Sequence, residues 1–478
     1  MVALTAINDW VDAPGSVVSW SPAPACAEKV RQAPTSSVPP SYQQEQHIRA
    51  YRRHAADGLD MARLMVPSWK IPGRCDIRAM TFVINAYLRR NDTYHSWFEF
   101  DDSDRAVRHT VADPTDIAMV ATRHGEMNSA KWQALAMDVP GPLQWDCFRF
   151  GVIQRADHFT FYASIDHLHA DAMFVAALFV EIHTNYAAVV EGGVPVRFPE
   201  SGRYLDYCSR QREYTAGLTL ESPEVADWLD YLRKNGGSLP KFPMPLGDPD
   251  VLCTGELNKV KLMDVHESDR FEAVCTSAGA RFIGGAFACA ALAERELTGI
   301  DTYNVITPTT TRRTPAEFAT TGWFTGVVPI SIPVAGKSFV EVARSAQEAF
   351  DAHLKLAHVP IERVLELAES LPDIRPAGPG VPMLSFFDSG LPPLDPVVMG
   401  QWYAQEGTLY GGVGAASQIG MWVNRGLEGT TISVAYPDNP VARESATQYV
   451  ELMKMFYLRA AGGRADALSS PHIPRATV

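Results

Sequence analysis

The interpretation of this chain depends on the stretch Asp166-His167-Leu168-His169-Ala170-Asp171-Ala172. An apolar, strand-like run from His158 to Ile165 (HFTFYASI) comes before it, and an apolar, helix-like run from Met173 to Val180 follows. Two histidines and two aspartates between two buried elements need a chemical reason, because burying polar groups without partners is costly. The stretch therefore marks a strand-to-helix turn that carries a candidate site.

A metal site is the first of three interpretations of this turn. His167, His169 and Asp171 form an H-x-H-x-D string at a strand end, like the start of the HxHxDH motif of metallo-β-lactamase-like hydrolases. Zinc binds such imidazole and carboxylate ligands. The last histidine of that motif is replaced by Ala172, and the later histidines lack a glycine-rich context. These departures weigh against a metallohydrolase.

A general base and a purely structural turn are the other two interpretations. An imidazole of near-neutral pKa, such as that of His167, can remove a proton from a hydroxyl group that attacks a carbonyl. Asp171 lies four residues further on and can brace the turn or pair with an arginine. In the structural interpretation, the histidines satisfy buried backbone groups, and Asp171 is a first-turn acid favoured by the helix dipole. No G-x-S-x-G elbow occurs, so nothing requires a covalent acyl-enzyme.

Length and composition narrow the classes of protein. The chain has 478 residues, 46% of them hydrophobic, which predicts two or three domains with large cores. A net charge of −13 without a cluster of basic residues argues against nucleic-acid binding. Seven scattered cysteines without a C-x-x-C pair disfavour both a disulfide framework and a zinc–cysteine site.

Hydrophobic periodicity predicts a mixed α/β fold in two lobes, 1–215 and 216–478. We expect residues 1–45, rich in Pro, Ser and Ala, to wrap over the surface, and the Gly/Pro-rich segment 192–250 to connect the lobes. Helices are predicted at 42–57, 77–90, 171–190, 223–234, 267–278, 284–297, 339–357 and 442–460. Strands are predicted at 94–100, 106–111, 148–154, 158–165, 255–263, 303–307, 326–334, 383–387, 418–424 and 430–436.

The turn also resembles the HHxxxDG motif of the condensation-domain superfamily, which includes chloramphenicol acetyltransferase-like enzymes. His167 and Asp171 stand at the positions of the second His and the Asp, while Asp166 replaces the first His and Ala172 the Gly. Two further segments, 90–98 and 322–330, resemble motifs of the same superfamily in order and spacing. The D-F-G-W-G motif of peptide-forming members is absent, which argues against a peptide-synthetase role.

Within this superfamily, the chain is most similar to the polyketide-associated (Pap) acyltransferases of mycobacteria, in the branch that acylates trehalose. The similarity lies in four segments, 39–44, 92–100, 311–315 and 421–425. It implies two chloramphenicol-acetyltransferase-like lobes in a V shape, with a tunnel at their interface. It also implies an acyltransferase that needs neither metal nor cofactor.

The resemblance assigns roles to individual residues. His167 is expected to act as the general base, and Asp171 to hold the loop through a salt bridge with Arg312 or Arg313. His169, Trp323 and Gln418 are candidates for lining the cleft, although packing beside the turn is the favoured interpretation of His169 and a core aromatic pair that of Trp323.

The function implied is O-acyl transfer of a long-chain fatty or polyketide acyl group to trehalose or a trehalose ester, in cell-envelope glycolipid biosynthesis. The donor is an acyl-CoA or an acyl-carrier thioester, and a polyketide synthase or lipid transporter is a candidate partner. A non-catalytic protein that binds acyl chains or a carrier protein is the alternative, and a metallohydrolase is less favoured. The N-terminus lacks signal-peptide features, and the apolar stretches near 172–182 and 284–292 are shorter than the ~18 residues of a membrane span. We therefore expect a cytoplasmic protein, with peripheral contact at the inner face of the plasma membrane left open.

Overall fold

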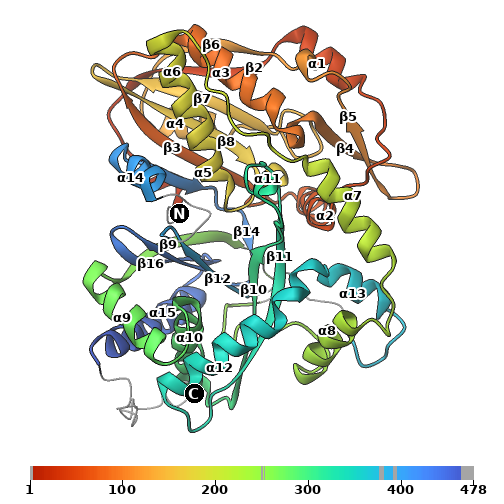
Figure 1. Cartoon of the computed structure of the whole chain (residues 1–478), viewed down its shortest axis with the longest axis vertical. Helices are drawn as coiled ribbons and strands as arrows, with labels where there is room; N and C mark the ends of the chain where they lie inside the picture. The colour runs from red at the N-terminus through yellow and green to blue at the C-terminus, as the bar shows by residue number, and fades with distance from the viewer. Residues whose placement is uncertain (1–3, 249–250, 252, 376–381, 391–395, 464–478) are drawn as a thin grey trace.

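The computed structural model describes residues 4–248, 251, 253–375, 382–390 and 396–463 as two stacked lobes (Figure 1). Each lobe is built on a seven-stranded sheet covered by helices. The mixed α/β class and the division into two lobes, both expected from the sequence, are thus confirmed.

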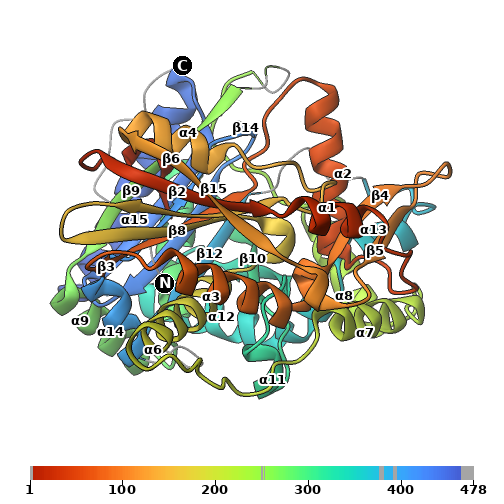
Figure 2. The ribbon, with the colours of Figure 1, turned by 90° about the horizontal axis from the view of Figure 1, so that it is seen from above.

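The sheet of the first lobe is mainly antiparallel and lies between two layers of helix (Figure 2). Helices α3 and α6 lie on one side of it, and α4 lies on the other. The strands, in spatial order, are β1 (Leu4–Ala6), β13 (Thr408–Gly411), β3 (Leu64–Pro72), β8 (His158–Asp166), β7 (Phe148–Gln154), β2 (Gly15–Pro22) and β6 (Met119–Met127). The helices are α1 (Pro24–Arg31), α2 (Tyr42–Ala56), α3 (Ile77–Arg90), α4 (Ser129–Met137), α5 (Phe174–Phe179), α6 (Asn185–Gly192) and α7 (Tyr204–Ala216), and β4 (Ser96–Phe100) with β5 (Ala106–Thr110) forms a separate ribbon.

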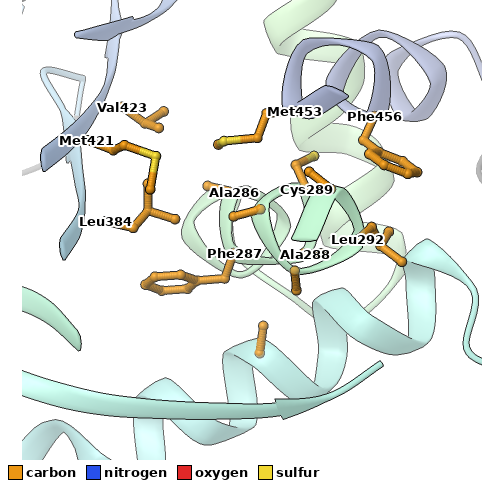
Figure 3. Packing of buried hydrophobic residues seen from close by; sticks show 14 of the residues in the cluster. Ala286, Phe287, Ala288, Cys289, Leu292, Leu384, Met421, Val423, Met453 and Phe456 are labelled. Atoms are coloured by element: carbon orange, nitrogen blue, oxygen red, sulfur yellow. The ribbon is translucent and has the colours of Figure 1, made fainter. Parts of the chain in front are cut away.

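The second lobe packs its helices around α10, whose central turns consist mostly of Gly, Ala and Cys, with Phe287 and Leu292 among them (Figure 3). A Cβ atom on Gly285 would lie 2.2 Å from the Cys275 sulfur, so the glycine allows α9 to approach closely. The strands, in spatial order, are β11 (Thr325–Pro333), β10 (Thr302–Thr310), β12 (Met383–Asp388), β15 (Gly420–Gly426), β16 (Gly429–Pro437), β9 (Cys253–Met263) and β14 (Ala415–Ala416). The helices are α8 (Pro223–Lys234), α9 (Val265–Ser277), α10 (Phe282–Thr298), α11 (Pro315–Phe318), α12 (Phe339–His353), α13 (Ile361–Leu367) and α15 (Pro440–Ala461).

One segment of the second half returns to the first lobe. Strand β13 lies between β1 and β3 in the first sheet, and the preceding helix α14 (Pro396–Ala404) packs Trp402 against Trp69 and Phe179. The predicted boundary after residue 215 therefore assigns every strand to the correct sheet except β13, which follows it in sequence but belongs to the first sheet. The chain order could not reveal the crossover, because strand pairing depends on contacts distant in sequence; the exact boundary stays a prediction.

The expectation that residues 1–45 wrap over the surface is wrong for β2. This strand hydrogen-bonds to both β6 and β7, and its Val17 and Trp20 are buried. The segment 192–250, expected to be a connector with one helix, also contains the 13-residue helix α7.

The helix expected at 171–190 forms instead at Phe174–Gly192, with a π-helical turn at Val180–Thr184. The whole segment is long and apolar enough to cross a membrane, which corrects the expectation that this apolar stretch is too short. Its Phe174, Leu178 and Ile182 are buried in the core of the first lobe, so it packs as a core helix.

Candidate active site

The candidate site begins where β8 ends and a single 3₁₀ turn, η4 (His167–His169), starts. The His167 backbone N–H donates to the Arg63 carbonyl at 2.8 Å, which ties the turn to the chain entering β3. The His167 side chain is half-buried, and its Nδ1 atom is buried without a hydrogen-bond partner among the described residues. This leaves Nε2 as the ring nitrogen that a substrate can reach.

The surroundings of His167 favour a neutral imidazole. Burial, and then the nearby His47, lower the pKa of His167 to about 4, because both disfavour the charged ring. A neutral imidazole can accept a proton at physiological pH. The ring is therefore in the protonation state that a general base requires.

Trp323 covers one side of His167. The two ring centroids are 4.1 Å apart with an interplanar angle of 42°, and Trp323 is itself half-buried. Trp323 belongs to the loop before β11 in the second lobe, and its backbone carbonyl accepts a hydrogen bond from Tyr204 at 3.1 Å. The structure thus places this candidate lining residue directly against the candidate base, across the two lobes.

Asp171 is joined to Arg312 by a buried, two-point salt bridge. The distances are 2.5 Å from Nη1 to Oδ2 and 3.2 Å from Nη2 to Oδ1, and both side chains are at most 3% exposed. The carboxylate also accepts from the backbone N–H groups of Met173 at 3.0 Å and Phe324 at 2.9 Å. The contact therefore fixes the strand-to-helix turn of the first lobe to the second lobe.

Arg313, the other arginine expected as a partner of Asp171, is exposed. Its backbone N–H donates to the Glu317 carboxylate at 2.6 Å. The structure thus selects Arg312 and not Arg313. Arg312 also donates to the carbonyls of Glu317 and Thr320, so its guanidinium is held from several sides.

His169 lies in the core, so the expectation that it lines the cleft is wrong. It is fully buried; Nδ1 lies 3.1 Å from the Thr93 hydroxyl, and Nε2 lies 3.2 Å from the Cys147 sulfur. Burial lowers its pKa to about 4. The ring packs against Tyr94 and Phe148, as the alternative of packing beside the turn predicted.

The same contacts separate the three ligands that a metal site would need. His169 bonds to Thr93 and Cys147, while Asp171 is held by Arg312. Among the described residues, no three His, Cys, Asp or Glu side chains are grouped to hold a metal ion.

Gln418 lies between β14 and β15, half-buried, with an Oε1 atom that is buried and has no described hydrogen-bond partner. The segment before it is bonded to the chain that leads into β3, because the Ala415 N–H donates to the Asp60 carbonyl at 2.7 Å. A cavity of about 460 Å³ also lies between the lobes, lined by residues that include Lys70, Thr160 and Thr408. Thr160 is near the start of β8, whereas His167 follows its end.

A buried ion-pair network beside His167 was not predicted from the sequence. Asp166 is fully buried and contacts both His47 of α2 and Arg63, which precedes β3. A charged residue at the end of an apolar strand was the available signal, since such a residue requires partners. The two partners are distant in sequence and could not be identified from it.

Comparisons with known proteins identify the family of this chain. The condensation-domain family model matches residues 61–371. Trehalose-2-sulfate acyltransferase PapA2 of Mycobacterium tuberculosis is 52% identical over 468 residues, covering 98% of this chain and 99% of the relative. The 2'-acyl-2-O-sulfo-trehalose (hydroxy)phthioceranyltransferase PapA1 of Mycobacterium bovis is 50% identical over 470 residues, with 98% and 91% covered.

Solved structures match over nearly the whole chain. A PapA2 acyl transferase structure has a TM-score of 0.91 at 51% identity, covering 96% of this chain and 99% of that one. The first condensation domain of the calcium-dependent antibiotic synthetase has a TM-score of 0.66 at 16% identity, covering 88% and 96%, which shows the fold alone. The chain belongs to the condensation-domain family and, within it, to the Pap acyltransferases.

Proposed function

We propose that this acyltransferase moves a long acyl chain from a thioester to a hydroxyl group of trehalose or a trehalose derivative, with His167 as the general base. The substrate class is supported by two relatives of at least 50% identity whose names specify sulfated trehalose acceptors. The observation that carries the chemistry is His167 itself, a half-buried imidazole kept neutral by its surroundings and packed on Trp323.

In the proposed reaction, Nε2 of His167 accepts the proton of the sugar hydroxyl as its oxygen attacks the thioester carbonyl. A C–O bond forms, and the carbonyl oxygen carries the negative charge of the tetrahedral intermediate. The C–S bond then breaks, and the imidazolium returns its proton to the departing thiolate. The products are the sugar ester and the free thiol, and the imidazole is restored.

Asp171 and Arg312 have a supporting role in this proposal. Both carboxylate oxygens of Asp171 are engaged by Arg312, so the carboxylate braces the turn and is not free to act on a substrate. Gln418 is a candidate donor to the carbonyl oxygen of the intermediate, since such donors stabilise developing negative charge. Trp323 is proposed to line the substrate path beside the base.

The donor is proposed to be an acyl-CoA or a carrier-bound thioester, with a polyketide synthase or a lipid transporter as partner. Synthesis in the cytoplasm, with contact at the inner face of the plasma membrane, fits a reaction that joins a soluble sugar to a lipid chain. These assignments rest on the resemblance to the trehalose-acylating branch of the Pap acyltransferases.

The proposal is tested by an acceptor screen. Purified protein is incubated with labelled palmitoyl-CoA and with trehalose, trehalose 2-sulfate or a mono-acyl trehalose, and esters are identified by mass spectrometry. We expect ester formation with at least one acceptor and its loss in His167→Ala. His158→Ala, at the first residue of β8 and at the opposite end of that strand from His167, is the matched control and should keep full activity.

Two outcomes would contradict the proposal. Full transfer by a folded His167→Ala variant would exclude His167 as the base. Binding of the acyl donor without turnover on any acceptor would instead indicate the non-catalytic alternative, a protein that holds acyl chains or a carrier.

A further inference from the structure

A buried charged network lies next to His167, and the proposed reaction does not use it. Asp166 is fully buried, with Oδ1 2.6 Å from Nε2 of His47 and Oδ2 2.8 Å from the guanidinium of Arg63. The side chains of His47 and Arg63 are only 3% and 13% exposed. The three groups thus form a compact unit on the chain segment that carries the candidate base.

A network of this kind is not explained by stability alone. Removing charged groups from water costs several kcal/mol per ion, and an apolar side chain of similar volume in place of a buried pair is often at least as stable. The surrounding strand and helix are apolar and offer such packing: Ile165 and Leu168, on either side of the network, are both buried. A role in holding a defined geometry is therefore the stronger explanation.

The network holds the backbone on both sides of His167. Oδ1 of Asp166 accepts the Leu168 N–H at 2.9 Å, and the Arg63 carbonyl accepts the His167 N–H at 2.8 Å. Arg63 also donates to the Val139 carbonyl at 2.5 Å, which anchors it beyond α4. Residues 166, 167 and 168 are thus all bonded to one unit.

His47 connects the network to Trp323, which packs on the His167 ring. Its ring meets Trp323 edge to face, with centroids 5.5 Å apart, and Trp323 packs on His167 at 4.1 Å. The centroids of His47 and His167 are 6.4 Å apart, so the three rings form one cluster. A single side chain from α2 therefore touches both the carboxylate behind the turn and the indole beside the imidazole.

We propose that His47, Asp166 and Arg63 are positioning residues that fix the His167 imidazole in the orientation needed for proton transfer, with His47 linking the turn to Trp323. The proposal rests on the proposed role of His167 as base. A displacement of about 1 Å of a catalytic group can lower the rate on the order of 100-fold. Residues that prevent such a displacement of His167 therefore contribute to the rate without contacting the substrate.

The network also affects the pKa of His167, which can be measured separately from the rate. Among the described residues, five ionisable groups surround the imidazole: His47 from α2, Asp166 at the end of β8, Asp171 after η4, and Arg63 and Arg312, which pair with the two carboxylates. Of these, His47 acts to lower the pKa of His167, while Asp166 and Asp171 act to raise it. Neutralising His47 and neutralising Asp166 should therefore move that pKa in opposite directions.

The test compares four full-length variants by steady-state kinetics and thermal unfolding. His47→Leu removes the hydrogen bond, His47→Gln keeps a donor near the Nε2 position, and Asp166→Asn removes the charge. His109→Leu is the matched control, because His109 also pairs with a carboxylate, Glu99 at 2.8 Å, and stacks on Trp97, but lies on β5 away from the turn.

For His47→Leu and Asp166→Asn we expect kcat to fall about 10- to 100-fold with KM changed less than threefold, because the base is displaced while the substrate sites remain. His47→Gln should recover most of kcat, and His109→Leu should match the original protein. The acid limb of kcat/KM should move to higher pH in His47→Gln and to lower pH in Asp166→Asn.

The proposal is overturned if folded His47→Leu and Asp166→Asn variants keep the original kcat, even with a lowered melting temperature. Should His47→Leu not fold, kcat of Asp166→Asn relative to His109→Leu decides: a fall of about 10-fold or more with KM little changed supports positioning, and an unchanged kcat refutes it. His167→Ala separates this inference from the proposed function. Loss of activity in His167→Ala together with normal kcat in the network variants refutes the positioning role alone.

Discussion

At the scale of single residues, the site combines one imidazole that stays neutral with one carboxylate that stays paired. His167 is half-buried with a pKa lowered to about 4, whereas Asp171 is almost completely buried against Arg312. Desolvation disfavours the charged form of the first group, and the guanidinium compensates the charge of the second. Two polar residues four positions apart thus lie in different surroundings, one without a charged partner at its buried nitrogen and one paired with an arginine.

The lowered pKa predicts an unusual pH profile. Below its pKa the imidazole is protonated and cannot accept the hydroxyl proton, so kcat/KM should stay level from about pH 8 to pH 5 and fall through about pH 4. An unperturbed histidine would give a fall near pH 6.5. Initial rates over pH 4–8 check this, and a midpoint near 6.5 would contradict it.

Acid stability must be followed in the same experiment. His167 and His169 both have a pKa of about 4 in the folded protein, so the unfolded chain binds more protons as the pH falls below about 6.5. Their contribution to stability is complete above that pH and is lost as the pH falls toward 4. Circular dichroism at each pH distinguishes lost catalysis from unfolding.

The arginine pair offers a matched test of the salt bridge. Arg312→Leu leaves the Asp171 carboxylate buried without its counter-charge, and we expect it to lower the free energy of unfolding by about 3–5 kcal/mol and to reduce activity. Arg313→Leu, one residue further along at an exposed position, should change stability by less than about 0.5 kcal/mol. Urea unfolding of both variants measures the difference; equal effects would refute the assignment of Arg312.

At the scale of elements, helix α10 shows how the second lobe accommodates a half-buried acid. Glu294 lies on this helix with no ion-pair partner among the described residues, and burial raises its pKa to about 7. The neighbouring turns pack closely because they are made mostly of Gly and Ala. The charged carboxylate of Glu294 is therefore poorly solvated, which lowers the free energy of unfolding.

This cost predicts a stabilising substitution. The charged form is disfavoured in the folded state, so Glu294 weakens the fold progressively as the pH rises from about 4.5 to 7 and fully above that range. Glu294→Gln should raise the free energy of unfolding by on the order of 1–3 kcal/mol at pH 8 and have little effect at pH 4.5. The exposed neighbour Glu296→Gln is the control, and equal gains at both pH values would contradict the explanation.

At the scale of the whole molecule, the two lobes are interlocked by more than a linker. The crossover α14–β13 supplies a strand to the first sheet, and Ser433 of β16 donates a hydrogen bond to the Leu4 carbonyl of β1 at 2.8 Å. The Asp171–Arg312 bridge and the Trp323–His167 contact also join the lobes. The candidate site is therefore complete only when both lobes are folded and joined.

This interlocking predicts that a residue of the second half stabilises the first lobe. Trp402, 1% exposed, has its ring 5.8 Å from Trp69 and 5.3 Å from Phe179. Trp402→Ala should cost about 3–5 kcal/mol through the lost burial and the cavity left behind. Urea unfolding checks this against Leu427→Ala, a change at an exposed site; equal stability of the two variants would refute the role of the crossover.

Features that depend on neighbours along the chain can be predicted from the amino-acid sequence. The turn after His158–Ile165 and the helices near 77–90 and 442–460 could be predicted, because hydrophobic periodicity carries that information. The roles of His167 and Asp171 are implied by the resemblance to the condensation-domain superfamily and stay predictions. Strands whose partners are distant, such as β2 and β13, could not be predicted.

Contacts between groups distant in the sequence are set by the fold. Arg312 and Arg313 are adjacent in the chain, yet one is buried against Asp171 and the other is exposed, because only one side chain points at the turn. His169 lies in the core, hydrogen-bonded to Thr93, and His47 of α2 contacts Asp166. A buried charge shows in the sequence that it needs a partner, but the fold determines which partner reaches it.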